Sequence, residues 1–270
     1  MSESEYYENP SHWELSGYQT EEQTKRYLEA IQLIPADVRS VLDAGCGNGM
    51  FLKHLQDQGR FDCRGLERSR AAIKTGVEQL GVKITEGDLG SIPFEDNSFD
   101  MVTSMEVLEH LPLPVFTKAI REMERVSRRY VLVNVPFREK RPFNECPSCG
   151  CSFPHCYHMR TFSEQGLAEL FPNCRMVSAR RTFAGYQPLL IHLWNSCRNR
   201  ISPPFPPLAR CPLCDYARDE AADARVSPPR TGARLKSSVL RLKVLQWPKV
   251  KVAEEILCLY EKTVSRTGRN

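Results

Sequence analysis

The stretch Val41-Leu-Asp-Ala-Gly-Cys-Gly-Asn-Gly49 constrains the fold more than any other part of the chain. Its first residues continue an apolar run from Ser40 and are typical of a buried strand. Three glycines follow, and Met50 to Gln58 then has apolar residues at helical spacing, with Gly59 where a helix would end. Glycines between a strand and a helix let the backbone approach a ligand closely. The stretch therefore predicts a ligand-binding turn in an α/β domain.

The composition of this turn limits the kind of ligand. Met50 stands where the dinucleotide pattern G-x-G-x-x-G would place its last glycine. Asp43 precedes the turn and would repel a pyrophosphate, whereas it suits a cationic group such as the ammonium of an amino acid. With no recognisable hydride-transfer site either, the sequence argues against an NAD-dependent oxidoreductase.

Strands and helices alternate through most of the chain. We expect a parallel sheet with helices packed on it, since this alternation is typical of α/β folds. The loop at 138–158 and the Pro-rich segment 198–250 interrupt the pattern. The expected helices are 21–34, 50–58, 69–80, 113–126 and 163–170, and the expected strands are 40–44, 63–67, 82–86, 99–104, 130–135, 176–183 and 256–260.

Two further strands end in acidic residues. Glu67 closes the second expected strand, where a carboxylate can accept hydrogen bonds from both hydroxyls of a ribose. Asp88 follows the third strand and can bond an adenine amino group, while Leu89 and nearby apolar side chains pack against the ring. Each residue alone is weak evidence, because most carboxylates at strand ends are simply solvated.

Taken together, these segments resemble class I S-adenosylmethionine-dependent methyltransferases, in particular the group similar to ubiquinone-biosynthesis methyltransferases. The resemblance rests on Val41 to Gly49, Gly87 to Asp100 and Met105-Glu-Val-Leu-Glu-His-Leu-Pro112, and His158-Met-Arg-Thr-Phe162 also matches a piece common in that group. It covers about residues 25–190 and the last strand. It implies a Rossmann-like sheet of seven strands, mostly parallel, with 256–260 antiparallel.

The resemblance also implies roles for individual residues. Asp43, Gly45, Gly47 and Gly49 would line the methionine half of S-adenosylmethionine. Glu67 would hold the ribose, and Asp88 with Leu89 the adenine. Met105 and Glu106 would border the sulfonium.

Residues outside the cofactor half are harder to assign. His110 follows the fourth strand and is the best-placed candidate for a catalytic base, although a structural histidine explains it equally well. The family often uses its N-terminal segment as a lid, so His12, Trp13 and Tyr18 are candidates to close over the acceptor. Aromatic packing without contact to substrate is the alternative.

Cysteine spacing predicts a metal site. Eight of the eleven cysteines lie between Cys146 and Cys214. Two C-P-x-C turns, Cys146 with Cys149 and Cys211 with Cys214, together supply the four thiolates of a structural zinc site. A local alternative combines Cys146 and Cys149 with two of Cys151, His155, Cys156 and His158, and the absence of any metal is a third possibility.

These features divide the chain into an N-terminal helical lid (1–35), a cofactor-binding core (36–197) containing the Cys-rich loop 138–158, a Pro-rich basic excursion (198–250) and the last core strand (251–264). The excursion holds the second Cys pair. From Arg198 to Lys251 the sequence has twelve Lys or Arg against four Asp or Glu. A solvated loop or a surface for phosphates explains this excess.

The leading functional hypothesis is a methyltransferase acting on a small-molecule or glycan-like acceptor. The alternatives are a zinc-bearing binding or regulatory protein that has lost the reaction, and a methyltransferase that modifies RNA or protein. Nucleic-acid binding is less favoured because the excursion has few aromatic residues to stack on bases. No apolar stretch has the length of a membrane span, and the acidic start is unlike a secretory signal, so we expect a cytoplasmic protein.

Overall fold

The computed structural model describes residues 7–15, 20–139, 143–154, 157–183, 186–188, 214, 216, 249–251 and 254–263. The chain divides into two compact units. The larger comprises 7–140, 158–182 and 253–270, and the smaller comprises 1–6, 141–157 and 183–252.

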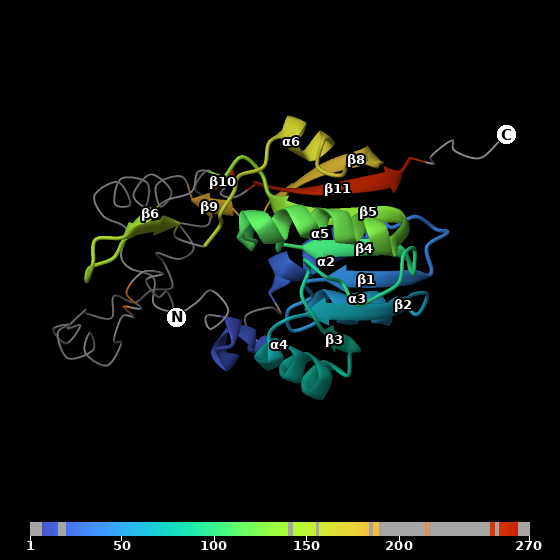
Figure 1. Cartoon of the computed structure of the whole chain (residues 1–270), viewed down its shortest axis with the longest axis horizontal. Coiled ribbons are helices and arrows are strands. Elements are labelled where there is room, and N and C mark those ends of the chain that lie inside the picture. Colours follow the sequence, from blue (N-terminus) through green and yellow to red (C-terminus); the bar gives the residue numbers. More distant parts are fainter. Residues whose placement is uncertain are drawn as a thin grey trace, which may run out of the picture. The chain divides into compact units, whose positions relative to one another are not determined.

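A seven-stranded sheet forms the centre of the larger unit, in the order β3-β2-β1-β4-β5-β11-β8 (Figure 1). The pairs from β3 to β5 are parallel, and β11 runs antiparallel to β5. This arrangement confirms the predicted Rossmann-like sheet with its antiparallel last strand. The strands are β1 (Ser40–Ala44), β2 (Asp62–Glu67), β3 (Ile84–Glu86), β4 (Phe99–Met105), β5 (Ser127–Pro136), β8 (Cys174–Phe183) and β11 (Glu254–Lys262).

Helices cover both faces of this sheet because side chains alternate between its two faces along each strand. Helices α5 (Leu113–Val126) and α6 (Glu164–Ala168) share a hydrophobic cluster with Val131 and Val133 of β5. Helices α2 (Glu21–Gln32) and α3 (Met50–Asp57) share the other cluster with Tyr130 and Leu132 of the same strand. Figure 1 shows α5 lying across β4 and β5.

Several element boundaries differ from the sequence prediction. The expected helix 69–80 is α4 (Arg70–Thr75), whose N-cap is Ser69, continued by a π-helical turn at Gly76–Leu80. The third strand begins at Ile84 rather than at residue 82, and Val82 packs in the cluster with α2 and α3. The remaining helical turns are η1 (Pro10–Trp13) and η4 (Leu108–His110).

The smaller unit contains two short antiparallel pairs. Strands β6 (Phe143–Glu145) and β7 (Ser152–Pro154) form a hairpin inside the expected Cys-rich loop. Strands β9 (Tyr186–Pro188) and β10 (Lys249–Lys251) pair as well, so the chain is brought together at the two ends of the segment between them. Most of the predicted excursion 198–250, including Cys211, lies outside the described residues.

Within the part of the chain that the structure describes, no helix is both long and apolar enough to span a membrane.

Candidate functional site

The carboxylate of Asp43 is buried at the end of β1, with 1% of the residue exposed. The hydroxyl of Thr103, on the neighbouring strand β4, donates a hydrogen bond of 2.8 Å to its Oδ1 atom. Burial raises the pKa of Asp43 to about 7, and the negative charge of Glu67 adds to this effect while the bond from Thr103 opposes it. A buried carboxylate with a raised pKa is an energetic cost that a bound cationic group would offset.

The turn after Asp43 requires its glycines. Gly45, Gly47 and Gly49 all have left-handed φ angles, of 80°, 53° and 77°. A Cβ atom at Gly45 would lie 2.7 Å from Val107, and one at Gly49 would lie 2.6 Å from Val82. The turn therefore packs closely against the protein while its backbone leads into α3, whose N-cap is Gly49.

We expect Gly49→Ala to lower the free energy of unfolding by about 2–4 kcal/mol, because the left-handed backbone and the contact with Val82 both disfavour a side chain. Gly59 is the matched control. It has a φ of 68° but nothing within 4 Å of an added Cβ, so Gly59→Ala should cost only about 1–2 kcal/mol. Urea denaturation of both variants measures the difference, and equal losses would show that packing at Gly49 is unimportant.

Glu67 lies at the end of β2, beside β1, and connects the turn to the next helix. Its Oε2 atom accepts a hydrogen bond of 2.9 Å from the amide of Gly47, and its Oε1 atom accepts bonds from the amides of Arg68 and Ser69. An ionised carboxylate has about four lone-pair positions, so one remains for a further donor. After β3, Leu89 is buried, whereas the exposed Asp88 accepts a bond of 2.7 Å from Gly90.

The N-terminal segment packs on this turn. A Cβ atom added at Gly47 would lie 2.8 Å from the ring of Trp13, and Asn48 donates a bond to the carbonyl of Trp13. Ser69 and the Trp13 indole both donate to the carbonyl of Tyr7, at 2.7 Å each. The segment thus packs against the turn. His12 lies in η1 and Tyr18 outside the described residues.

An ion-paired group lies where β4 ends. Met105 closes the strand, and Glu106 follows with a left-handed φ of 58°, unusual for a residue with a side chain. Arg26 of α2 forms ion pairs with both Glu106 and Glu255, the latter on β11. Partial burial and the charge of Glu255 raise the pKa of Glu106 to about 7. Sequence reasoning identified Glu106 but missed Arg26 and Glu255, which lie far from it in the chain.

His110 is part of a cluster that the sequence did not predict. One ligand atom each from Glu109, His110 and His158 lies within 4.8 Å of the other two. The two imidazole rings meet edge to face with centroids 4.6 Å apart. Glu109 is 1% exposed, and neither of its carboxylate oxygens has a hydrogen-bond partner among the described residues. The structure therefore places His110 beside a buried carboxylate and a second histidine.

Three predicted cysteine ligands converge in the smaller unit. The Sγ atoms of Cys146, Cys149 and Cys214 all lie within 4.8 Å of one another, and those of Cys146 and Cys214 are 3.6 Å apart. The fourth predicted ligand, Cys211, lies outside the described residues, as do His155 and Cys156 of the local alternative. Cys151 does not join this group, and His158 belongs to the cluster with Glu109 and His110.

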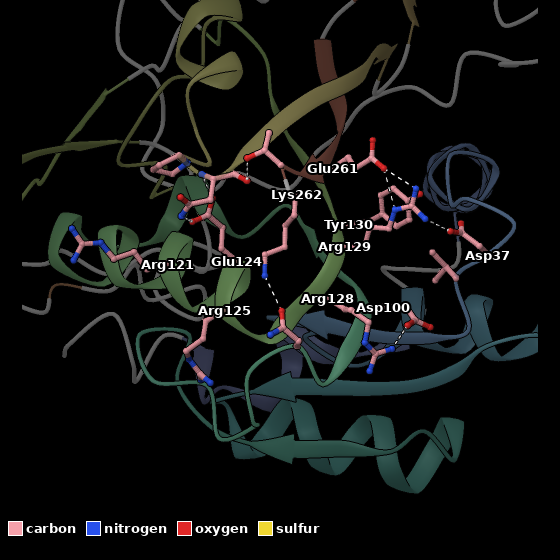
Figure 2. Close-up of a pocket in the computed structure, with 15 residues that line it drawn as sticks. Asp37, Asp100, Arg121, Glu124, Arg125, Arg128, Arg129, Tyr130, Glu261 and Lys262 are labelled. Atoms are coloured by element: carbon pink, nitrogen blue, oxygen red, sulfur yellow. Dashed lines mark hydrogen bonds and ion pairs between the residues drawn. The ribbon is translucent and has the colours of Figure 1, made fainter. Parts of the chain in front are cut away.

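A separate hollow of about 1150 Å³ lies at the opposite edge of the sheet, where β4 and β5 begin (Figure 2). Its charged side chains largely pair with one another: Arg128 with Asp100, and Arg129 with Asp37 and Glu261. Ligands of open α/β sheets bind at the carboxyl ends of the strands. We therefore assign the candidate site to the edge that carries Asp43, Glu67 and Glu106.

Several known proteins are similar in sequence to the part of the chain that contains the candidate site. Residues 42–131 match the methyltransferase-domain family. The norajmaline N-methyltransferase of Rauvolfia serpentina is 33% identical over 97 residues, which cover 33% of this chain and 32% of that protein. The demethylmenaquinone methyltransferase of Renibacterium salmoninarum is 32% identical over 115 residues, covering 42% and 46%. This chain thus spans a third to a half of the length of these relatives.

Solved structures agree with the fold. An S-adenosylmethionine-dependent methyltransferase from Archaeoglobus fulgidus superposes with a TM-score of 0.51 at 14% identity, covering 92% of this chain and 97% of the other. The sheet order, the turn after β1 and the domain match define a methyltransferase-type α/β domain. Residues 42–131 and the fold of the larger unit are thus similar to those of S-adenosylmethionine-dependent methyltransferases.

Proposed function

We propose that this protein transfers the methyl group of S-adenosylmethionine to a small-molecule or glycan-like acceptor. The observation that carries the proposal is the position of Asp43, Glu67 and Asp88 at the carboxyl ends of three neighbouring parallel strands, β1, β2 and β3. The relatives named above, a norajmaline N-methyltransferase and a demethylmenaquinone methyltransferase, support a small acceptor.

The residues present fit the cofactor. Asp43 is a buried carboxylate that a cationic ammonium would stabilise, and three of the residues between it and α3 are glycines without a side chain. Glu67 retains a lone-pair position for a ribose hydroxyl beyond its three amide bonds. Leu89 is buried beside Asp88, which suits an adenine ring and its amino group.

S-adenosylmethionine supplies an activated methyl group on a sulfonium, so the protein has only to orient it and exclude water. In this proposal Asp43 binds the ammonium of the cofactor's methionine part, and Glu67 binds a hydroxyl of its ribose. Trp13 and Tyr7 cover the turn and limit access of water. Met105 and Glu106 lie at the end of β4, next to the side from which an acceptor would approach.

Titration calorimetry with S-adenosylhomocysteine tests the cofactor half of the proposal. We expect micromolar binding by the full chain, with Glu67→Ala weakening it by about tenfold or more, since hydrogen bonds to a charged group contribute about 1.5–3 kcal/mol. Transfer of labelled methyl from S-adenosylmethionine to a panel of hydroxyl- and amine-bearing acceptors then tests catalysis. A folded protein that binds no S-adenosylhomocysteine would refute the proposal.

We also propose a structural zinc ion held by Cys146, Cys149, Cys211 and Cys214. The three thiols that the structure describes lie within 4.8 Å of one another, which is near the separation expected for ligands of one tetrahedral ion. A four-cysteine shell leaves no open position, so this zinc would stabilise the smaller unit without taking part in catalysis.

Zinc content of purified variants tests this assignment. Cys214→Ser should reduce bound zinc from about one equivalent to a small fraction and lower the melting temperature. Cys151→Ser is the matched control, because the Cys151 side chain packs beside Cys146 but lies outside the thiol group. If Cys151→Ser loses zinc and Cys214→Ser retains it, the local ligand set is correct instead.

A further inference from the structure

The cluster of Glu109, His110 and His158 has the composition of a metal site. Two imidazoles and one carboxylate are a common ligand set for divalent first-row metals, and three protein ligands leave coordination positions open. Their ligand atoms lie within 4.8 Å of one another. Bonds of about 2.0–2.2 Å to one ion place neighbouring ligand atoms about 3–4 Å apart, so metal binding would draw these three side chains closer together.

The carboxylate of Glu109 is the strongest indication that a cation belongs here. It is 1% exposed, and neither oxygen has a hydrogen-bond partner among the described residues. Leaving a buried acceptor without a partner is costly, and a bound cation would remove that cost.

The surroundings orient both histidines as ligands. The Nδ1 atom of His158 lies 2.6 Å from the carboxylate of Glu139, and the Nδ1 atom of His110 lies 3.1 Å from the Tyr7 hydroxyl. When each Nδ1–H donates to its oxygen partner, each Nε2 atom is unprotonated and can bind a metal. Histidine ligands commonly have such a partner on the other ring nitrogen.

Backbone contacts keep the two histidine segments together. Met159 donates an amide hydrogen bond of 2.7 Å to the carbonyl of Glu109. The guanidinium of Arg160 donates to the carbonyls of Leu108 and Leu111. These hydrogen bonds hold the segment after His158 against the turn η4. The distance between His110 and His158 is therefore set by the backbone as well as by their side-chain conformations.

From this geometry we infer that Glu109, His110 and His158 bind one divalent metal ion, with Glu139 as the positioning residue of His158. Resting on the proposed methyltransferase function, the inference also specifies the acceptor: the open coordination positions would take a hydroxyl oxygen. Such an ion lowers the pKa of the hydroxyl. The hydroxyl proton leaves to solvent, the oxygen bonds the methyl carbon, and the carbon–sulfur bond breaks with its electron pair remaining on sulfur. In this arrangement His110 is a ligand rather than the base.

Titration of the zinc-loaded chain with Mn²⁺, followed by electron paramagnetic resonance, tests the site. Mn²⁺ prefers nitrogen and oxygen ligands to thiolates, so the cysteine cluster should not compete for it. We expect one equivalent to bind the wild type. Glu109→Gln and His158→Gln should weaken binding at least tenfold, and Glu139→Gln by about 10- to 100-fold. Glu78→Gln, an exposed change on the π-helical turn, should leave the affinity unchanged.

A thermal-shift measurement separates a metal ligand from a merely structural residue. Without metal, Glu109→Gln should melt at or above the wild-type temperature, because a neutral amide replaces an unpartnered buried carboxylate. Mn²⁺ should raise the melting temperature of the wild type only. Absence of Mn²⁺ binding, or equal binding by Glu109→Gln, would overturn the inference. Parallel titration with S-adenosylhomocysteine keeps the outcomes distinct, since failure to bind S-adenosylhomocysteine refutes the methyltransferase function alone.

Discussion

Asp43→Asn should weaken binding of S-adenosylhomocysteine by about 100-fold or more while making the empty protein more stable. The loss follows from removing the charge that would face the cofactor's ammonium, a charge-assisted contact of about 3 kcal/mol. Stability rises because Asp43 is almost completely buried and its pKa is raised to about 7. The amide oxygen of Asn can still accept the hydrogen bond from Thr103.

The stability gain has a defined pH range. The pKa of Asp43 is higher in the folded protein than in the unfolded chain. Its ionisation therefore lowers the free energy of unfolding progressively as the pH rises from about 3.8 to about 7. The gain from Asn should therefore be absent near pH 3.8 and complete above pH 7, reaching on the order of 2–4 kcal/mol. Chemical denaturation at pH 5 and pH 8 measures it. Asp57→Asn, at an exposed residue on α3, is the control and should change neither property.

The same pKa governs how binding depends on pH. Only the ionised form of Asp43 attracts an ammonium, and at pH 6 about a tenth of the empty sites would carry it. The affinity of the wild type for S-adenosylhomocysteine should therefore rise about tenfold from pH 6 to pH 8, and that of Asp43→Asn should stay flat. An affinity of the wild type that is independent of pH would contradict the assignment of the ammonium to Asp43.

Arg26→Gln should lower the free energy of unfolding by about 3–5 kcal/mol at pH 8. Arg26 is 14% exposed and pairs with two carboxylates, those of Glu106 and Glu255. Removing the guanidinium leaves two carboxylates close together in a partly buried site with no positive charge to pair with them. The pKa of Glu106 should then rise above its present value of about 7. Because protonation relieves the repulsion, the loss should be smaller at pH 5.

Arg129→Gln is the matched control for this experiment. Arg129 also pairs with two carboxylates, those of Asp37 and Glu261, but its side chain is 52% exposed. Exposed ion pairs contribute about 0–1 kcal/mol, so this variant should unfold almost as the wild type does. Equal losses in Arg26→Gln and Arg129→Gln at pH 8 would show that burial of the Arg26 group does not matter.

Local patterns in the sequence predicted the sheet and picked out the residues that we propose bind the cofactor. The glycine turn, the acidic ends of β1 and β2 and the helix 113–126 are all encoded within short stretches, where spacing and residue type decide the structure. The C-P-x-C turns likewise predicted thiols that converge, and the structure brings Cys146, Cys149 and Cys214 together.

Local sequence patterns could not predict contacts between segments that are far apart in the chain. Thr103 orients Asp43, Arg26 pairs with Glu255 across 229 positions, and His158 meets His110 only because η4 and the segment 158–160 are hydrogen-bonded. A motif shows which side chains occur close together in the chain. Which buried charges face one another depends on strand order and on how loops pack, and both are properties of the whole tertiary structure. The sequence by itself therefore determined the fold class and identified the residues that we propose bind the cofactor, whereas the tertiary structure decided the partners of each charge.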